Sequence, residues 1–402
     1  GNKIADIGRI GAVPWPDYPF ELTADVDGTL NTLHITALEA RWGDSDLSGD
    51  GSVSLQGRPH IEVRGQSNLL DIYDLQHALF GSPEDMEPED DLDKVFGDAP
   101  IPIHLFADFD GSLDIQVERF RGQRSRLEDI SLELNVKDGA LILHRAAYRD
   151  ETGYFDLNAL LRPEGDDLYL ELSLAAEDAD VGLFTSRAQN RDSVPRYDMD
   201  VDIWGYGITA AELAAGLNGT LLISSEGGEI NNGLVEALGG DFLANVLETL
   251  NPFVESEEFT RMECLVLNAS IEDGKLKMEP GFVMRTDRLN MFVYGGVNLK
   301  RETLDLSLAT QARRGIGISA ASITNPYFKI GGTLASPALQ LDPASAAIAA
   351  SVATATAGLS ILVRGVFERL MGTRNPCPEF LEYEQKVPAR PGSKVEAQAS
   401  GT

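Results

Sequence analysis

The amino-acid sequence predicts a mainly β protein that folds as an antiparallel meander of hairpins. The first observation is strict alternation of apolar and polar residues, as in the runs 168–174 (LYLELSL) and 197–203 (YDMDVDI). A period of two places apolar side chains on one face of a strand and polar side chains on the other. The second observation is a recurring turn signal, because Asp-Gly and Asn-Gly tolerate the positive φ of tight hairpins. These dipeptides occur at residues 27–28, 50–51, 110–111, 138–139, 218–219 and 273–274.

Each alternating strand has one apolar face, and the sequence provides little helix to cover these faces. Leaving apolar area in water costs about 25 cal/mol per Å². A second layer of protein or the acyl chains of a lipid must therefore cover them. We predict that one apolar set per strand points inward and is a candidate for lining a lipid groove. The candidates are Leu113, Ile115, Val117, Leu132, Leu134, Val136, Leu168, Leu170, Leu172, Leu174, Met199, Val201, Ile203, Leu304, Leu306 and Leu308.

Three segments make up the predicted β region. Residues 1–80 form a first β-hairpin repeat segment. Residues 81–97 are acidic, contain proline and have few large apolar side chains, which is typical of a linker or loop. Residues 98–341 form the main β segment, in which alternating runs flank most of the turn signals.

Two helices and a tail complete the predicted elements. The first helix, at about residues 232–250, is inserted in the main β segment and has an apolar stripe at helical spacing. The second is an Ala-rich C-terminal helix over residues 342–372, and residues 373–402 form a tail predicted to be largely disordered. Residues 344–363 carry no charge, which meets the length rule for a membrane span. Their Ala, Ser and Thr content favours a helix packed on the sheet, with interfacial membrane contact and a true span as alternatives.

The charge balance excludes one class of function. The 402 residues include 33 basic and 64 acidic side chains, a formal net charge of −31. Such a surface repels phosphate groups, so nucleic-acid binding is excluded and broad docking on anionic headgroups is disfavoured. A soluble acidic exterior is the simplest interpretation.

The two cysteines leave two alternatives open. Cys264 lies in a predicted strand and Cys377 in a Pro-rich segment, and neither belongs to a C-x-x-C pair, so no zinc site is indicated. They are either two free thiols or a disulfide that ties the C-terminal segment to the sheet. The disulfide requires an oxidising compartment.

The sequence contains no pattern that marks out a catalytic site. It has no H-E-x-x-H, G-x-S-x-G, P-loop or dinucleotide fingerprint, so we predict a protein that is not an enzyme and needs no cofactor. A weak calcium-loop candidate has oxygen ligands at every second position. Its twelfth position is Leu55 instead of Glu, which favours a polar hairpin turn and no metal. The four candidate ligands are Asp44, Asp46, Ser48 and Asp50.

Several segments resemble the AsmA family, and they follow one another in the family's order. Residues 42–72 (WGDSDLSGDGSVSLQGRPHIEVRGQSNLLDI) resemble its repeated unit, a Gly-Asp-Ser turn followed by two strands around an Arg-Pro link. Residues 205–232 resemble its short helix followed by L-x-G and a Gly-rich strand. Further matches are residues 251–253 (NPF), the Cys264 strand, residues 271–274 (IEDG), residues 326–337 (PYFKIGGTLASP) and the Ala-rich helix. The resemblance covers most of residues 20–380 and is to the family's C-terminal region.

The resemblance implies a long curved β-sheet of repeating hairpins, shaped as a half-pipe with an apolar interior and without catalytic residues. It implies a periplasmic protein of Gram-negative bacteria with an N-terminal inner-membrane anchor. We expect that anchor to lie outside this sequence, which begins at Gly1. It also implies a role in phospholipid movement and outer-membrane assembly. The expected partners are a phospholipid or other acyl-chain lipid and envelope proteins, with membrane contact through regions outside this sequence or the C-terminal helix.

Two function hypotheses follow. In the first, the chain is a periplasmic lipid-binding conduit between the inner and outer membranes, and acyl chains cover the apolar strand faces. In the second, it is a structural or assembly scaffold of the envelope whose sheets bury each other in a closed sandwich or barrel. A third interpretation, glycan binding, ranks last because the three tryptophans are scattered.

Overall fold

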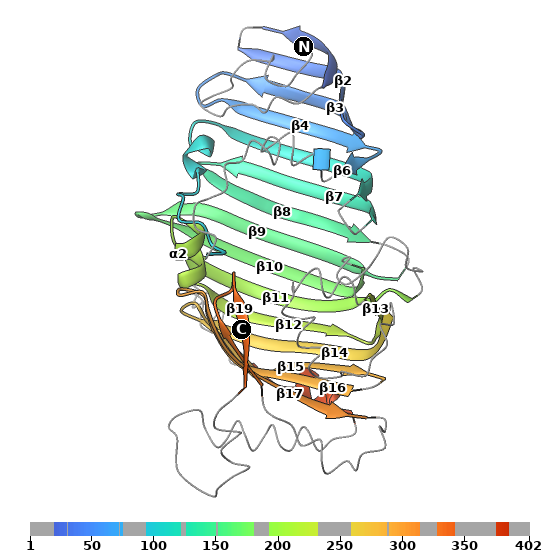
Figure 1. Cartoon of the computed structure of the whole chain (residues 1–402). Coiled ribbons are helices and arrows are strands. Elements are labelled where there is room, and N and C mark those ends of the chain that lie inside the picture. The colour runs from blue at the N-terminus through green and yellow to red at the C-terminus, as the bar shows by residue number, and fades with distance from the viewer. Residues whose placement is uncertain are drawn as a thin grey trace, which may run out of the picture.

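The described part of the chain forms one 19-stranded β-sheet in the computed structural model, which confirms the predicted fold class. Figure 1 shows the strands stacked in sequence order, with the N-terminal strands at one end and β17 near the other. The structure describes residues 20–29, 31–71, 73–74, 94–121, 126–149, 152–180, 193–231, 259–287, 289–313, 328–341 and 375–385.

The strands are mostly eight to fourteen residues long, with shorter ones at β5, β13, β18 and β19. Their bounds are β1 (Glu21–Gly28), β2 (Thr32–Trp42), β3 (Ser45–Ser54), β4 (His60–Ser67), β5 (Leu70–Asp71), β6 (Asp110–Arg121), β7 (Arg126–Lys137), β8 (Ala140–Arg149), β9 (Tyr154–Glu164), β10 (Asp167–Ala179), β11 (Tyr197–Tyr206), β12 (Asn218–Ser225), β13 (Gly228–Asn231), β14 (Phe259–Glu272), β15 (Lys275–Thr286), β16 (Leu289–Asn298), β17 (Thr303–Ala312), β18 (Phe328–Gly332) and β19 (Pro337–Leu341).

The sheet is antiparallel except at one junction. β4 and β5 both pair with β6 in parallel. This junction joins the predicted first and main β segments into one sheet across the acidic segment 81–97, of which only residues 94–97 are among the described ones. The two segments therefore share a single continuous layer.

Two of the predicted turns have the geometry that their sequence requires. Asp138-Gly139 (φ 52° and 79°) and Asp273-Gly274 (φ 48° and 66°) each place two consecutive residues at positive φ, as a type I′ hairpin demands. The dipeptides at 50–51, 110–111 and 218–219 are not turns, because they lie within β3, β6 and β12, and residues 27–28 are the last two residues of β1. Close strand contact is one reason for glycine inside β3. A Cβ at Gly51 would lie 2.6 Å from the Glu62 carbonyl oxygen of β4.

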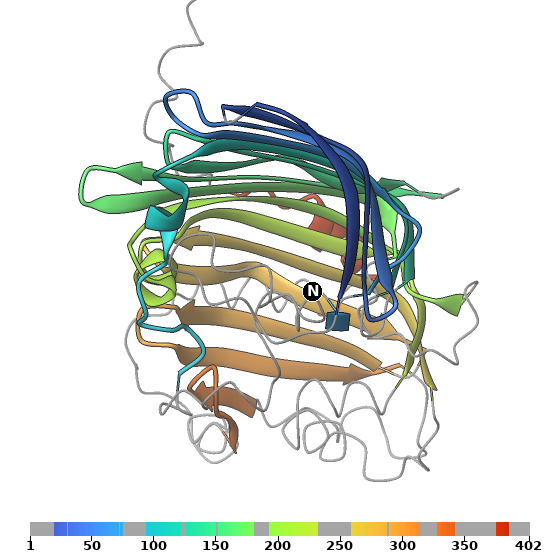
Figure 2. The same cartoon turned by 90° about the horizontal axis from the view of Figure 1, so that it is seen from above.

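The sheet is curved and open. Figure 2 shows it bending around an interior that is open on one side, as a half-pipe. Among the described strands, β1 pairs only with β2 and β19 only with β18, so the two ends do not meet. The closed sandwich or barrel of the scaffold hypothesis is therefore wrong. The twist of the strands bends this one layer without closing it.

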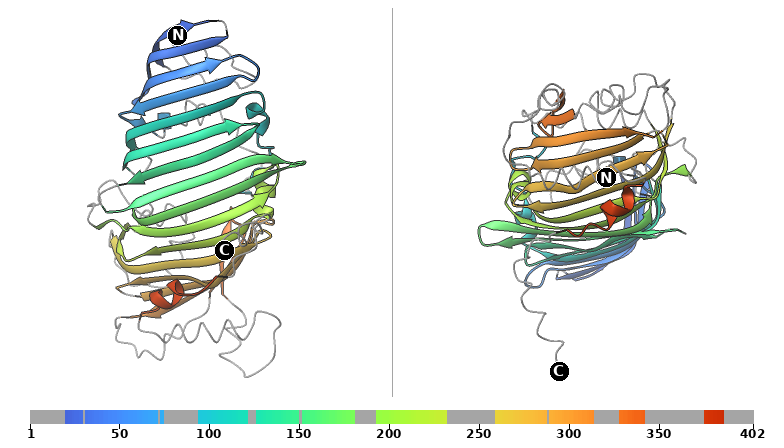
Figure 3. Two further views of the ribbon diagram at one scale, coloured as in Figure 1. Left: turned by 180° about the vertical axis from the view of Figure 1, so that it is seen from behind. Right: turned by 90° about the horizontal axis from the view of Figure 1, so that it is seen from below.

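Short helices border the sheet in the described part of the chain. The 3-10 helix η2 (Ile103–Phe106) precedes β6, and α2 (Ala210–Ala215) connects β11 to β12. α6 (Cys377–Leu381) lies on the convex side, as the view from behind shows (Figure 3). It falls within the predicted tail, whose residues 375–385 pack on the sheet, and residues 386–402 lie outside the described residues. No helix among the described residues is long and apolar enough to cross a membrane.

The two longer predicted helices are not tested. Residues 232–250 and 342–372 lie outside the described residues. Their predicted roles, including membrane contact by the second helix, stay predictions.

Candidate functional site

The strand register places the predicted apolar sets on the same face of the sheet. Residues directly opposite each other in an antiparallel pair point to the same side. Between β6 and β7, Leu113 is opposite Leu134 and Ile115 is opposite Leu132. Two strands that looked independent in the sequence therefore share one apolar face.

This face continues without interruption from β6 to β17. One line of paired residues crosses eleven strands in order and contains only apolar residues. It consists of Val117, Ile130, Tyr148, Phe155, Ala176, Met199, Ile223, Leu267, Phe282, Val293 and Leu308. A one-residue shift in the register of any strand would break such a line, because it would turn that strand's apolar side chains to the other face.

A second line runs parallel to the first and contains five of the remaining candidates. It consists of Leu113, Leu134, Leu143, Ala159, Leu172, Ile203, Gly219, Ile271, Leu276, Val297 and Leu304. Every groove candidate belongs to one of these lines or lies two or four residues from a member along its own strand, which places it on the same face. All of them lie on one face, which we call the apolar inner face.

The apolar inner face is the concave one. α6 lies on the convex side (Figure 3), and its Phe380 packs against Val266, Val283 and Phe292. Val266 and Val283 are paired across β14 and β15 and alternate with Leu267 and Phe282 of the first line. The face opposite α6, which carries both lines, therefore faces the interior that Figure 2 shows.

Exposure varies along the inner face. Val117 and Leu308 are 3% and 1% exposed, and Val136 and Leu168 are also buried. The other groove candidates are only partly buried. Leu308 is covered because Ile330 of β18 packs on it. Away from such contacts, the inner face keeps apolar surface that described residues do not bury.

Several inner-face residues could not be read from alternation. In β8 the pairing shifts between Leu143 and Ala146, and both residues belong to the inner face. Such a bulge inserts an extra residue and hides the period of two. β14, β15 and β16 each contain a short continuous apolar run, which does not indicate which side chains point inward. These runs are residues 264–267 (CLVL), 282–284 (FVM) and 291–294 (MFVY).

The convex face is polar over much of its length. On β11, Asp198, Asp200 and Asp202 alternate with the inner-face residues, and on β6 Asp114 and Glu118 are exposed. Asp198 and Asp200 are exposed and Asp202 is partly buried, and all of these carboxylates contribute to the net charge of −31. The two faces of the sheet thus differ strongly in polarity.

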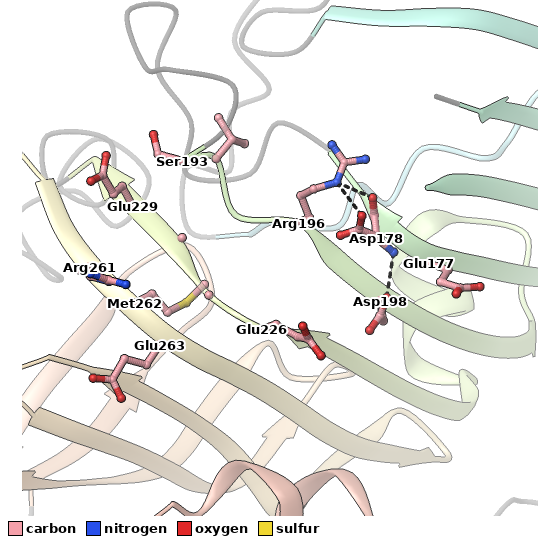
Figure 4. A pocket seen from close by; sticks show the side chains of 13 residues that line it. Glu177, Asp178, Ser193, Arg196, Asp198, Glu226, Glu229, Arg261, Met262 and Glu263 are labelled. Atoms are coloured by element: carbon pink, nitrogen blue, oxygen red, sulfur yellow. Dashed lines mark hydrogen bonds and ion pairs between the residues drawn. The ribbon is translucent and has the colours of Figure 1, made fainter. Parts of the chain in front are cut away.

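A polar pocket of about 770 Å³ lies at one rim, where β10, β11, β13 and β14 begin or end (Figure 4). Arg196 pairs with Asp178 there, with 3.3 Å between Nε and Oδ2, and the Asp178 amide donates to Asp198 Oδ1 at 2.8 Å. Six carboxylates and two arginines line the pocket, which makes it unfavourable for an anionic headgroup. The lining residues are Glu177, Asp178, Ser193, Val194, Arg196, Asp198, Glu226, Gly227, Gly228, Glu229, Arg261, Met262 and Glu263.

The calcium-loop candidates do not form a loop. Asp46, Ser48 and Asp50 lie along β3, where extended backbone separates alternate side chains instead of wrapping them around an ion. Asp46 Oδ1 accepts hydrogen bonds from the amides of Asn68 (2.9 Å) and Leu69 (2.8 Å), and Asp44 pairs with Arg121. No group of three or more metal-binding side chains occurs among the described residues.

Cys264 and Cys377 form a disulfide, with 6.5 Å between their Cα atoms. It joins β14 to the start of α6 across 113 residues of sequence. Of the two alternatives, the structure contains the one that ties the C-terminal segment to the sheet.

Comparisons with known proteins agree with this architecture. A family model described as the AsmA family matches residues 30–280, more than half of the chain. The AsmA family protein YhjG of Escherichia coli (strain K12) is 23% identical over 425 residues, which covers 96% of this chain and 59% of that protein. The chain therefore spans less than two thirds of this relative's length, and no solved structure matches it. As the resemblance of residues 42–72 and 205–232 predicted, the chain belongs to the AsmA family.

Proposed function

We propose that this chain is a lipid-binding conduit segment of the cell envelope, and that its apolar inner face holds the acyl chains of phospholipids. The observation that carries the proposal is the unbroken register of apolar residues from β6 to β17 on the concave face of an open sheet. The AsmA family consists of envelope-associated proteins and is generally non-enzymatic. We accordingly propose no catalytic role and no cofactor.

Geometry and polarity support this function over a scaffold role. An open sheet with one continuous apolar face needs a cover, since apolar area in water costs about 25 cal/mol per Å². An acyl chain supplies that cover along the strand-to-strand direction, while the headgroup stays at the open side in water. A protein partner bound to the open sheet is the alternative cover of the inner face.

The disulfide supports the proposed location. Disulfides form and persist in oxidising compartments such as the bacterial periplasm and are rare in the cytosol. The bond between Cys264 and Cys377 therefore supports a periplasmic position. Phospholipid transport between the membranes, outer-membrane biogenesis and inner-membrane anchoring of the full-length protein belong to the same proposal.

The test replaces two inner-face leucines in the middle of β10. Leu170→Asn together with Leu172→Asn places two amides on the lipid-facing side. We expect co-purified phospholipid, measured by native mass spectrometry and lipid extraction, to fall by about tenfold, because burying an amide without a hydrogen bond is costly. Transfer of a fluorescent phospholipid between vesicles should fall in parallel.

The matched control carries the same chemistry on the opposite face of the same strand. Ser173→Asn with Ala175→Asn should leave lipid content and transfer unchanged, since both residues alternate with the inner-face leucines. Circular dichroism should show the same β content in all three proteins. Equal lipid content in the inner-face variant and the wild type would contradict the proposal of a lipid conduit. A lipid-free wild type after incubation with vesicles would also contradict the conduit and would favour a protein partner as the cover of the inner face.

A further inference from the structure

The C-terminal segment 375–385 is held on the convex face of the sheet by a covalent bond and one buried side chain. The disulfide joins Cys377, at the first position of α6, to Cys264 of β14. Three residues later, the Phe380 side chain is fully buried (0% exposed), with its ring centroid 6.2 Å from that of Phe292. We call residues 375–385 the clasp.

The sheet also binds the clasp backbone. The Asn268 Nδ2 amide, on β14, donates to the carbonyl oxygens of Phe380 (3.0 Å) and Tyr383 (3.2 Å). The Gln385 Nε2 amide donates to the Leu221 carbonyl oxygen (2.9 Å) and to Asn268 Oδ1 (2.6 Å). Asn268 is itself 1% exposed. The clasp is thus held in one position by an anchor side chain and main-chain hydrogen bonds, as a bound peptide would be.

The clasp covers an apolar patch on a face that is otherwise rich in carboxylates. Under α6, strands β14 to β17 place apolar side chains on the convex side as well as on the inner one. The residues under or beside the clasp are Leu222, Cys264, Val266, Val283, Phe292, Tyr294 and Ala309. Removing the clasp would expose a contiguous apolar surface, the kind of surface that drives protein association.

The non-covalent part of this attachment is small. α6 has five residues, and a helix of that length is not stable without tertiary contacts. The neighbouring Leu381 is 46% exposed and Tyr383 is 42% exposed, so Phe380 and the smaller Pro376 are the fully buried apolar side chains of the clasp. The disulfide links the clasp directly to β14, which raises the local concentration of the clasp at its site above that given by the polypeptide chain alone.

We propose that the clasp is redox-conditional: it covers the convex apolar patch while the Cys264–Cys377 bond is intact and leaves the patch when that bond is reduced. Reduction by an external dithiol proceeds by thiolate attack on one sulfur and release of the other cysteine. A second attack within the dithiol then frees the first cysteine, so the dithiol is oxidised and both cysteines become thiols. The proposal does not depend on lipid binding, because the patch lies on the face opposite the inner one.

The first test measures how strongly docking of the clasp favours formation of the Cys264–Cys377 disulfide. The full chain is equilibrated in buffers of reduced and oxidised glutathione, quenched with acid and alkylated, and the fraction with the Cys264–Cys377 bond is measured by mass spectrometry. Phe380→Ala should lower the effective concentration of the two thiols by about tenfold or more, since it removes the buried anchor. Leu381→Ala, in the same helix and half exposed, should change it by less than about twofold. Equal effects of the two substitutions would overturn the proposal.

The second test locates the change in the molecule. Hydrogen exchange is followed in the oxidised and reduced wild type at the amides of Phe380 and Glu382, which donate to Pro376 and Pro378 carbonyl oxygens. Reduction should speed exchange there by about tenfold or more and leave β7 to β10 unchanged. Binding of a hydrophobic dye should rise at the same time. Unchanged protection of the clasp amides after reduction would overturn the proposal. Loss of protection throughout the sheet would also overturn it, because the disulfide would then stabilise the whole sheet and not the clasp alone.

Discussion

Glu263, at the rim end of β14, is held between two arginines. Its Oε2 lies 2.6 Å from Arg285 Nε, and its Oε1 lies 2.8 Å from Arg313 Nη1. Hydrogen bonds from Arg313 and Arg285, with the charges of the same two groups, lower the pKa of Glu263 to about 2. The two ion pairs of Glu263 connect β14 to the C-terminal ends of β15 and β17.

The lowered pKa of Glu263 predicts a pH-dependent stability. A carboxyl group with a lowered pKa stabilises the folded state above its unfolded pKa of 4.5, and this contribution is lost as the pH falls towards about 2. Glu263→Gln should therefore lower the Tm at neutral pH by about 1–2 °C, as expected for a partly exposed pair. The difference from the wild type should shrink below pH 4.5 and vanish near pH 2. Thermal unfolding at several pH values measures it.

A matched control is available in the same strand. Glu272 pairs with Lys277 at 2.9 Å, but its side chain is 65% exposed. Glu272→Gln should change the Tm less than Glu263→Gln at neutral pH. A Glu263→Gln difference that grows on acidification would contradict the assignment.

At the scale of elements, the parallel junction between β4 and β6 depends on a buried polar cluster. Asp74 Oδ2 accepts hydrogen bonds from the amides of Asp44 (2.8 Å) and Ser45 (3.0 Å) and from the Ser45 hydroxyl (2.8 Å). The Ser45 Oγ in turn accepts from the Asp71 amide at 2.9 Å, and Asp71 pairs with Arg121 at the end of β6. The cluster links the β2–β3 turn to the point where the chain leaves β5.

Removing Asp74 should destabilise this junction selectively. Asp74→Ala leaves the amide of Ser45, a residue that is 1% exposed, without its acceptor, at a cost of about 1–3 kcal/mol. Urea denaturation measures the loss, and hydrogen exchange at the Ser45 amide shows whether it is local. Asp50→Ala, on the same hairpin and exposed, should stay within about 0.5 kcal/mol of the wild type. Equal effects of both substitutions would argue against the cluster.

At the scale of the whole molecule, electrostatic repulsion between carboxylates opposes the folding of this open acidic sheet. Carboxylates gather on the convex face of one layer, and the net charge is −31. Self-repulsion of this kind destabilises a compact state, and salt screens it. Surface ion pairs such as Lys277–Glu272 contribute little in return.

Salt should therefore stabilise the protein. Between about 10 mM and about 100 mM NaCl the Debye length falls from about 30 Å to about 10 Å, which weakens repulsion between neighbouring strands. We expect the Tm to rise across this range. A falling Tm would mean that attractive ion pairs dominate.

The predictions from sequence were strongest where one local rule decided the outcome. Alternation in runs such as 168–174 predicted a strand with one apolar face, and the register agrees. Asp138-Gly139 and Asp273-Gly274 were predictable as turns because their conformation is local. The dipeptides at 50–51, 110–111 and 218–219 were not, because long-range pairing places the same residue types inside strands.

The sequence by itself determined which side chains share a face within a regularly alternating strand such as 168–174, because that depends only on the period of two. Only the tertiary structure decided which strands share a continuous face, since register and bulges such as the one between Leu143 and Ala146 come from long-range pairing. It also decided that the sheet stays open, that β4 and β6 run parallel, and that Cys264 meets Cys377. These features join residues far apart in the chain, and no local pattern encodes which distant partner a strand or a thiol will find.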